Sequence, residues 1–365
     1  MKSAFILIPF SAILLASCGG NSEPQEVIPA EDSTKVILSY ENEKHLANVR
    51  QLTFGGDNAE AYWSFDDASL VLQITNPNWN IPCDQIYLMN ATAERDSMPL
   101  PMLSTGKGRT TCAYFMPDDK SVLYASTHHV SEECPEVPER GEKYVWALYD
   151  SFDIFVADLQ GNVTAQLTKE PGYDAEATVS PKGDKIVFTS TRSGDVELYT
   201  MNIDGSGIKQ ITNELGYDGG AFFSPDGTRI VFRASRPTTP EAVKEYKDLL
   251  KEGLVQPVDM EVFVCNSDGS DVQQVTNLGK ANWCPYFHPS GEKIIFASNH
   301  SSEKGFPFNL YMINIDGTGL EQITSDPTFD AFPMFSNDGK KMVWGSNRFN
   351  GGTRETNIFV ADWVE

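Results

Sequence analysis

The sequence lacks the short motifs that mark the common catalytic classes. It has no G-x-S-x-G nucleophile elbow, no phosphate-binding loop, and no H-x-H or H-E-x-x-H spacing for a metal. Histidine is scarce, with 5 residues in a chain of 365. These absences leave little basis for a serine hydrolase, a nucleotide hydrolase or a zinc protease.

Basic residues are also in short supply. The chain has 28 Lys and Arg against 51 Asp and Glu, which gives a formal net charge of -23. Such a charge is repelled by phosphate backbones and by anionic lipid headgroups. We therefore expect no nucleic-acid partner and no direct adsorption to a membrane surface.

Near the amino terminus, an apolar stretch from Ala4 to Ala16 follows Lys2 and is too short to span a bilayer as a permanent anchor. It ends in Leu-Ala-Ser-Cys-Gly, which resembles a bacterial lipobox with Cys18 as the lipidated residue. We predict a lipoprotein signal peptide over residues 1–17; an ordinary signal peptide is the alternative. By analogy with lipoprotein sorting, Gly19 favours the outer membrane, facing the periplasm.

The segment after the predicted cleavage site differs in composition from the rest of the chain. Residues 18–34 are polar and acidic and contain proline, which is typical of a flexible tether. Residues 35–365 are long for one domain by the usual rule, but internal repetition accounts for their length.

The stretch from Gln210 to Ser235, QITNELGYDGGAFFSPDGTRIVFRAS, recurs with substitutions along the chain. A short apolar run precedes its Ser-Pro-Asp-Gly turn and an alternating run follows it, which predicts a β-hairpin, and two further short strands come after. The same turn position recurs in six copies, which begin at Ser64, Met116, Ser180, Ser224, His288 and Ser336. Six copies of a four-stranded antiparallel sheet predict an all-β, six-bladed β-propeller.

The two ends of the repeat array predict how the ring closes. The chain ends on a third-type strand, at about 357–362, and no fourth strand follows it. A fourth-type strand lies instead at the beginning, around 49–53. We expect this amino-terminal strand to complete the sixth blade, because pairing removes an open sheet edge.

Pieces of the repeat such as SPDG, IVFTSTRSG and LYTMNIDGSG resemble the PD40 repeats of TolB-type propellers, from about Val49 to the carboxyl terminus. Known relatives include periplasmic Tol-system proteins that bind partner lipoproteins, propellers attached to peptidases, and metal-dependent oligogalacturonate lyases. The resemblance implies the fold more strongly than any one of these functions.

Besides Cys18, the sequence holds an odd number of cysteines, so at least one thiol is left unpaired within the chain. Cys83 and Cys134 lie in inserted loops of consecutive blades, and we prefer them as a pair. Cys112 has no assignment. For Cys265 and Cys284, which fall in predicted strands, buried free thiols are the alternative to a second bridge.

Every long insertion falls on one face of the predicted propeller, which we call the top face. The insertions cover residues 76–84, 127–152, 236–260, 299–308 and 347–356. Loops on a rigid scaffold commonly carry function. Residues 240–250 have helical character, with Pro240 at the start and Gly253 beyond the end, and predict either a lid or docking helix or one that only covers its own blade.

Aligned positions at the top of the blades pair an acidic with a basic residue in three copies. Asp174 aligns with Arg192, Asp218 with Arg236, and Asp330 with Arg348. A repeated pair favours a structural ion pair that fixes each blade top. We also include these six residues as the rim of a candidate binding site.

Blades two and five, on opposite sides of the ring, hold histidine in place of that arginine. His128 and His300, with Trp283 nearby, are candidates for specificity, and Glu60 and Glu176 are predicted to point toward the channel mouth. Histidines and carboxylates around a funnel are able to hold a divalent metal or to act as acid and base. Without supporting spacing we expect no metal and no cofactor.

Aromatic residues are frequent in the predicted top-face loops and strand starts: Trp79, Tyr144, Trp146, Tyr149, Trp283, Phe306 and Phe308. Such rings suit a protein or glycan surface, and they also pack loops against each other. We therefore predict a monomeric, non-enzymatic binding scaffold for an envelope protein, peptide or glycan. The alternative is a metal-dependent lyase or hydrolase of acidic oligosaccharides, and a third possibility is a scaffold that uses its outer rim.

Overall fold

The computed structural model describes residues 38–92, 99–138, 143–303 and 305–365, and residues 38–365 form one compact unit. The predicted signal peptide, Cys18 and the tether lie outside the described residues. Within the described ranges, no helix is long and apolar enough to cross a bilayer.

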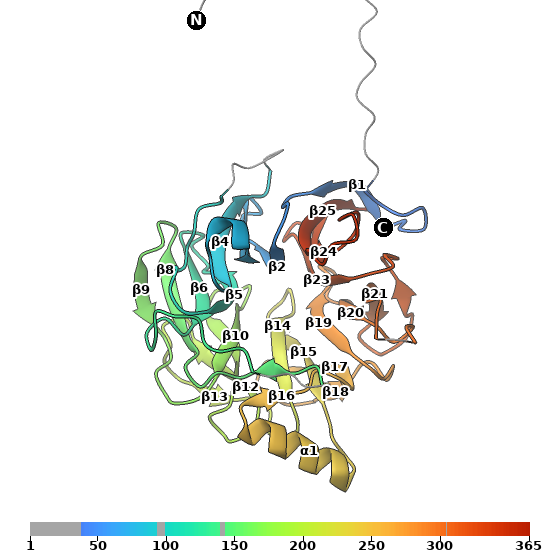
Figure 1. Cartoon of the computed structure of the whole chain (residues 1–365). Coiled ribbons are helices and arrows are strands. Elements are labelled where there is room, and N and C mark those ends of the chain that lie inside the picture. Colours follow the sequence, from blue (N-terminus) through green and yellow to red (C-terminus); the bar gives the residue numbers. More distant parts are fainter. Residues whose placement is uncertain (1–37, 93–98, 139–142, 304) are drawn as a thin grey trace, which may run out of the picture. The chain divides into compact units, whose positions relative to one another are not determined.

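Small antiparallel sheets stand around a central axis, as Figure 1 shows. In the part of the chain that the structure describes they make six blades, which confirms the predicted propeller. Blade one contains β2 (Asp57–Trp63), β3 (Ser69–Thr75) and β4 (Gln85–Asn90). Blade two contains β5 (Thr110–Phe115), β6 (Ser121–Ser126), β8 (Asp153–Asp158) and β9 (Val163–Gln166). Blade three contains β10 (Asp174–Val179), β11 (Lys185–Ser190), β12 (Glu197–Asn202) and β13 (Lys209–Gln210).

Blades four to six follow the same order around the ring. Blade four contains β14 (Asp218–Phe223), β15 (Arg229–Ser235), β17 (Met260–Asn266) and β18 (Gln273–Gln274). Blade five contains β19 (Asn282–Phe287), β20 (Lys293–Ser298), β21 (Asn309–Asn314) and β22 (Glu321–Gln322). Blade six contains β23 (Asp330–Phe335), β24 (Lys341–Ser346), β25 (Asn357–Trp363) and β1 (Leu46–Gln51). In blade one the fourth position is a bridge between Met102 and Tyr87 rather than a full strand.

The repeated turn closes each hairpin through local hydrogen bonds. In blade four the Ser224 hydroxyl donates to Asp226 at 2.6 Å, and the Gly227 N–H donates to the Ser224 carbonyl at 2.7 Å. Gly227 closes the turn at φ 68°, a left-handed conformation that glycine adopts without steric cost. The Ser-Pro-Asp-Gly pattern therefore marks the hairpin for a physical reason.

The ring closes through its two ends, as predicted. β1 pairs antiparallel with β25, with Arg50 opposite Val360 and Gln51 opposite Phe359. The observed strand begins at Leu46, three residues earlier than expected. Figure 1 shows this strand beside the last blade, where it covers an edge that would otherwise be free to pair with another chain.

Each innermost strand contains a β-bulge, where its register against the second strand shifts. One residue per bulge takes φ between 51° and 60°, and its side chain, or the space where a glycine has none, lines the channel. We call these six residues the channel ring: Glu60, Cys112, Glu176, Gly220, Cys284 and Phe332. The bulge re-aims these positions toward the axis.

Two residues further along, four of the six innermost strands carry aromatic side chains that fill the channel. The Tyr62 and Phe222 ring centroids are 5.6 Å apart, and those of Phe222 and Tyr286 are 5.1 Å apart. Tyr114 packs against both Tyr62 and Phe222. We call these four rings the aromatic plug; they give the channel a closed floor beneath the channel ring.

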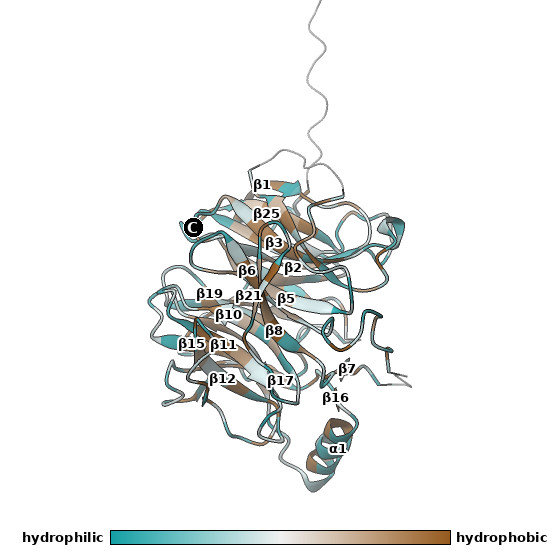
Figure 2. Ribbon diagram, turned by 90° about the vertical axis from the view of Figure 1, so that its left-hand side faces the viewer, coloured by the Kyte–Doolittle hydropathy of each residue, from teal (hydrophilic) through white to brown (hydrophobic). Residues whose placement is uncertain are grey.

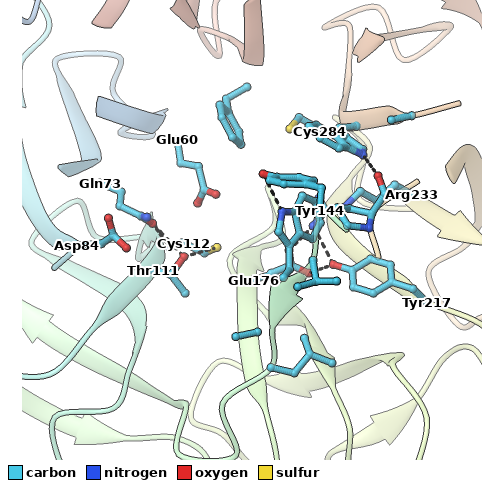
Figure 3. A pocket seen from close by; sticks show the side chains of 18 of the residues that line it. Glu60, Gln73, Asp84, Thr111, Cys112, Tyr144, Glu176, Tyr217, Arg233 and Cys284 are labelled. Atoms are coloured by element: carbon cyan, nitrogen blue, oxygen red, sulfur yellow. Dashed lines mark hydrogen bonds and ion pairs between the residues drawn. The ribbon is translucent and has the colours of Figure 1, made fainter. Parts of the chain in front are cut away.

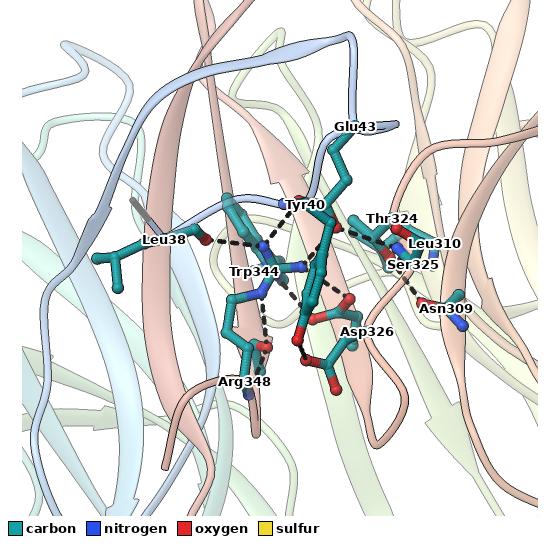
Figure 4. Close-up of polar contacts among 12 residues, drawn as sticks. Leu38, Tyr40, Glu43, Asn309, Leu310, Thr324, Ser325, Asp326, Trp344 and Arg348 are labelled. Carbon is teal, nitrogen blue, oxygen red and sulfur yellow. Dashed lines mark hydrogen bonds and ion pairs between the residues drawn. The ribbon is translucent and has the colours of Figure 1, made fainter. Parts of the chain in front are cut away.

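A buried ion cluster fastens the segment before β1 to the sixth blade, as Figure 4 shows. Arg348 donates to both oxygens of Glu43 at 3.0 Å and to Asp330 at 2.9 Å, and all three side chains are fully buried. It also donates to the Leu38 carbonyl at 3.2 Å. The cluster ties the predicted Asp330–Arg348 pair to ring closure.

We predict that Glu43→Ala weakens this closure. The substitution leaves Arg348 paired with Asp330 but removes two charge-assisted hydrogen bonds from the buried guanidinium, which costs about 3 kcal/mol. Urea unfolding followed by circular dichroism measures the loss, with Glu41→Ala as control because Glu41 is exposed two residues away. Equal unfolding midpoints for the two variants would contradict a role for Glu43 in closure.

Candidate functional site

Two long insertions meet above the channel and form a lid. One runs from β6 to β8 and the other from β15 to β17. They join through a two-stranded sheet in which β7 (Trp146–Ala147) pairs with β16 (Leu254–Val255), and Leu148 N–H donates to the Gly253 carbonyl at 2.7 Å. The lid thus links blades two and four.

The predicted helix is present as α1 (Pro240–Lys251) and lies next to β16 and β7, as Figure 2 shows. Thr239 caps its amino terminus by accepting a hydrogen bond from Ala242 N–H at 3.2 Å. On its inner side, the buried Tyr246 donates from its hydroxyl to the Asp195 carboxylate. The helix therefore braces the lid against blade three.

A disulfide holds the lid from its other side. Cys83 and Cys134 are bonded with Cα atoms 6.0 Å apart, which confirms the preferred pairing. The bond ties the blade-two insertion to the loop before β4. Of the other cysteines in the described ranges, Cys112, Cys265 and Cys284 are free thiols; the alternative of a buried free thiol is confirmed for Cys265, whereas Cys284 is free but half-buried.

Beneath the lid lies a cavity of about 620 Å³. Its walls carry six of the seven aromatic residues singled out in the sequence: Tyr144, Trp146, Tyr149, Trp283, Phe306 and Phe308. Trp283 stacks on Phe308 with centroids 4.4 Å apart and packs against Trp146 at 5.3 Å. Trp79 does not take part; it packs on Tyr87 within blade one.

The cavity mouth exposes apolar side chains. Phe306 is 64% exposed, Val137 55% and Tyr144 48%. Exposed apolar residues that surround a concave site are typical of a binding surface.

A buried ionic network occupies one side of the cavity floor (Figure 3). The Arg233 guanidinium pairs with Glu176 and also donates to the Tyr217 hydroxyl at 2.8 Å. The Trp146 ring of the lid lies 5.1 Å from the guanidinium carbon, within the range of a cation–π contact. Burial is the largest effect and disfavours the ionised Glu176, but Arg233 together with hydrogen bonds from the Thr189 hydroxyl, the Tyr217 hydroxyl and the Gly220 N–H outweighs it and lowers the pKa of this carboxyl.

Arg233 reaches the cavity floor because blade four leaves a gap. The channel-ring position of that blade is Gly220, and a Cβ atom there would lie 2.7 Å from the Arg233 Cζ atom. Arg233 sits in the second strand, where the aligned residues of the other blades are all uncharged: Gln73, Ala125, Thr189, Ala297 and Gly345. One guanidinium thus fills the space of a missing side chain.

Glu60 lies across the cavity from Arg233, and its side chain points toward the cavity (Figure 3). One carboxyl oxygen interacts with the Cys112 thiol, while Oε2 is buried with no hydrogen-bond partner. Burial, with a smaller contribution from Glu176, raises the pKa of Glu60 to about 7. Nearby, Arg109 pairs with Asp84 at 3.1 Å.

Of the residues predicted for the site, Glu60, Glu176 and Trp283 meet in the cavity, whereas the acidic and basic blade-top residues do not line it. Those residues form the three predicted ion pairs within the blades: Asp174–Arg192 at 2.7 Å, Asp218–Arg236 at 2.5 Å and Asp330–Arg348 at 2.9 Å. Each arginine lies over an aromatic ring of the third strand, so it faces away from the channel. The geometry fits the structural interpretation of these pairs.

In their own blades, the two histidines lie where the arginines lie in the other three, over an aromatic ring of the third strand. His128 packs on Phe155 at 4.3 Å, and His300 packs on Tyr311 at 4.5 Å. Each accepts or donates a hydrogen bond with a serine of its own blade, and burial lowers the pKa of each imidazole. Neither lines the cavity, so the structure does not bring them together with Trp283.

A metal centre finds no ready ligand set in the described parts of the chain. No group of three or more His, Cys, Asp and Glu side chains there has an arrangement that would hold an ion.

Sequence reasoning missed Cys112, Cys284, Phe332 and Arg233. The first three share the alignment column of Glu60 and Glu176, four residues before the turn anchor. Reading that whole column would have found the channel ring. Arg233 carried its own signal, since it is the single charged residue in its column.

Fold and cavity together define a β-propeller with a lidded central pocket. The family model of the TolB beta propeller domain, PD40, matches residues 133–244. Together with the six-bladed ring, this match confirms the resemblance to the PD40 repeats of TolB-type propellers.

Solved structures with a similar fold include the putative TolB from Agrobacterium tumefaciens, with a TM-score of 0.51 and 17% identity over 85% of this chain and 91% of that chain. TolB from Acinetobacter baumannii has a TM-score of 0.49 and 17% identity, and the match covers 84% of this chain and 63% of that chain. An oligogalacturonate lyase from Vibrio parahaemolyticus has a TM-score of 0.45 and 13% identity, and the match covers 86% of this chain and 93% of that chain. At these identities the likeness concerns the fold alone.

We predict that Gly220→Ala destabilises the protein by about 1–3 kcal/mol, because an added methyl group overpacks the space that Arg233 fills. Combining it with Arg233→Ala should remove most of that cost, since the clash disappears. Urea unfolding of the two single variants and the double variant measures the coupling.

Gly194→Ala is the matched control, because Gly194 has φ 90° and open space around its Cβ position. It carries the backbone cost of a left-handed alanine without a clash, so it should show no coupling to Arg233→Ala. Additive effects of Gly220→Ala and Arg233→Ala would contradict the proposed packing.

Proposed function

We propose that the protein is an exported, monomeric lipoprotein whose propeller is a non-enzymatic recognition scaffold. Its ligand is a protein, peptide or glycan of the cell envelope, and it binds in the lidded cavity on the top face. A TolB-like propeller is in general a binding scaffold, which agrees with this proposal. The carrying observation is the cavity itself, which long insertions from several blades build over a closed floor.

The construction of the cavity favours binding over passage. Its floor is sealed by the aromatic plug, so a ligand that enters at the mouth meets a dead end. The walls come from a lid held by a disulfide, by strand pairing and by stacked aromatic rings. A preformed site of this kind loses little conformational entropy when it binds.

The polar groups of the cavity also favour recognition. Glu176 and Asp84 are neutralised by Arg233 and Arg109. Burial raises the pKa of the Cys112 thiol, and that of Cys284 to about 12, so both thiols stay protonated and weakly nucleophilic at neutral pH. Recognition then depends on Trp283, Glu60 and Glu176 rather than on the two histidines.

Photo-crosslinking in living cells tests the site. With a photoreactive amino acid at the exposed Phe306, we expect an adduct with the envelope ligand, because this side chain lies at the cavity mouth. The same substitution at Val163, which is 41% exposed in β9, is the matched control.

An adduct at Val163 and none at Phe306 would support the scaffold that uses its outer rim. A stoichiometric divalent ion in the purified protein would instead favour the metal-dependent lyase or hydrolase.

The proposed lipid anchor has its own test. Metabolic labelling with a fatty acid should mark the protein, and Cys18→Ser should abolish the label and release the protein from the membrane fraction. Cys265→Ser is the control, because Cys265 is a buried free thiol of β17. Unchanged labelling of Cys18→Ser would overturn the anchor, while label in the inner-membrane fraction would overturn the outer-membrane assignment.

A further inference from the structure

We infer that the cavity recognises a primary ammonium group carried on an apolar body, with Glu60 as its counter-ion. This inference rests on the proposed function and names the chemistry of the ligand. The same chemistry occurs in a small alkyl amine and at the amino terminus of a peptide.

The first argument is the balance of charge in the cavity. Its lining contains three carboxyl groups and two guanidinium groups: Glu60, Asp84, Glu176, Arg109 and Arg233. Arg109 pairs with Asp84 and Arg233 with Glu176. Glu60 is therefore the one acid of this lining without a cation, and a ligand with a single positive charge balances it.

The second argument is the position of the Glu60 carboxyl group. Glu60 is a channel-ring residue at φ 51°, and its side chain points into the cavity in Figure 3. Its Oε2 atom is buried without a hydrogen-bond partner. A buried oxygen in this state costs free energy until a donor reaches it, and an ammonium group supplies up to three.

The third argument is the surrounding surface. Aromatic rings dominate the walls, and apolar side chains line the mouth. The faces of Trp283 and Tyr144 add favourable cation–π interactions to burial of an apolar body. An anion meets the opposite conditions, with an uncompensated carboxylate inside and a net charge of -23 on the chain.

Two further hydrogen-bond donors in the cavity favour the amino terminus of a peptide as the source of the ammonium group. The Nε atoms of Arg109 and Arg233 are buried without hydrogen-bond partners. Each belongs to a guanidinium that is already paired with a carboxylate, so a neutral carbonyl oxygen suits it better than a second anion. A peptide terminus presents a carbonyl beside its ammonium group.

Binding should depend on pH through Glu60. Its pKa of about 7 leaves the carboxyl mostly protonated at pH 6 and mostly ionised at pH 8, while an alkyl amine stays protonated at both. Affinity for the cation therefore rises with pH across this window. The titratable and charged groups that surround Glu60 are Tyr62, Asp84, Arg109, Cys112, Glu176, Arg233 and Cys284.

Of these neighbours, the two thiols and Tyr62 have pKa values raised by burial, and the pKa of Glu176 is lowered because Arg233 and its hydrogen bonds together outweigh burial. These four groups therefore do not titrate in the same window as Glu60.

Calorimetric titration of the full-length protein in detergent tests the inference at pH 6 and pH 8. The probes are phenethylamine and its neutral isostere 2-phenylethanol. We expect phenethylamine to bind at least about tenfold more tightly than the alcohol at pH 8, as one charge-assisted hydrogen bond implies. Its affinity should fall several-fold at pH 6.

Glu60→Gln should remove this preference for the amine, and Glu60→Asp should retain part of it because the charge is kept. Glu241→Gln, on the exposed start of α1, is the matched control and should bind like the unaltered protein. Thermal unfolding of each variant verifies that it is folded. Equal affinity for amine and alcohol, an unchanged preference in Glu60→Gln, or no binding of phenethylamine would each overturn the inference.

A tripeptide Phe-Gly-Gly distinguishes the two sources of the ammonium group. Tighter binding than phenethylamine, lost on acetylation of its amino terminus, identifies a peptide terminus; weaker binding than phenethylamine identifies a small amine. The crosslinking experiment tests the proposed function independently of the ammonium site. An adduct at position 306 that persists in Glu60→Gln would leave the binding scaffold in place and overturn only the ammonium site.

Discussion

The pairing of β1 with β25 is the contact on which the rest of the structure depends. A four-stranded sheet has two faces to bury, and each blade covers its neighbours only when the ring is complete. The ends of the chain supply that completion, and Arg348 secures it by joining Asp330 in the last blade to Glu43 before the first. The same closure sets the width of the central channel, and so it fixes how far the six innermost strands stand from the axis.

Given a closed ring, equivalent positions in the blades form layers along the channel. The bulge in each innermost strand points one residue per blade into the lumen, and the aromatic plug follows two residues later. Five of the six channel-ring residues have side chains, and the sixth, Gly220, makes room for Arg233. Function in such a fold depends on departures from the repeat, because the repeated residues are already committed to packing.

The sequence predicted those features that depend on local or repeated patterns. Turn chemistry at Ser224 and Gly227 marked the hairpins, the missing fourth strand predicted ring closure, and loop positions predicted the bond between Cys83 and Cys134. The placement of the histidines was not predictable in this way. Whether a residue at the end of a second strand turns toward the channel or over the third strand depends on side-chain packing, and His128 follows the aromatic ring of Phe155.

The cavity floor shows why a charged group is retained at the centre of an apolar fold. Burying an ion pair such as Arg233 and Glu176 gains little stability over a well-packed apolar pair, because desolvation offsets the attraction between the charges. The pair does have a structural consequence: it holds the guanidinium against Trp146, which connects the floor of the cavity to its lid. It also neutralises one of the two glutamates that enter the channel. Glu60 is thereby left as the carboxyl group of the cavity lining that has no paired cation.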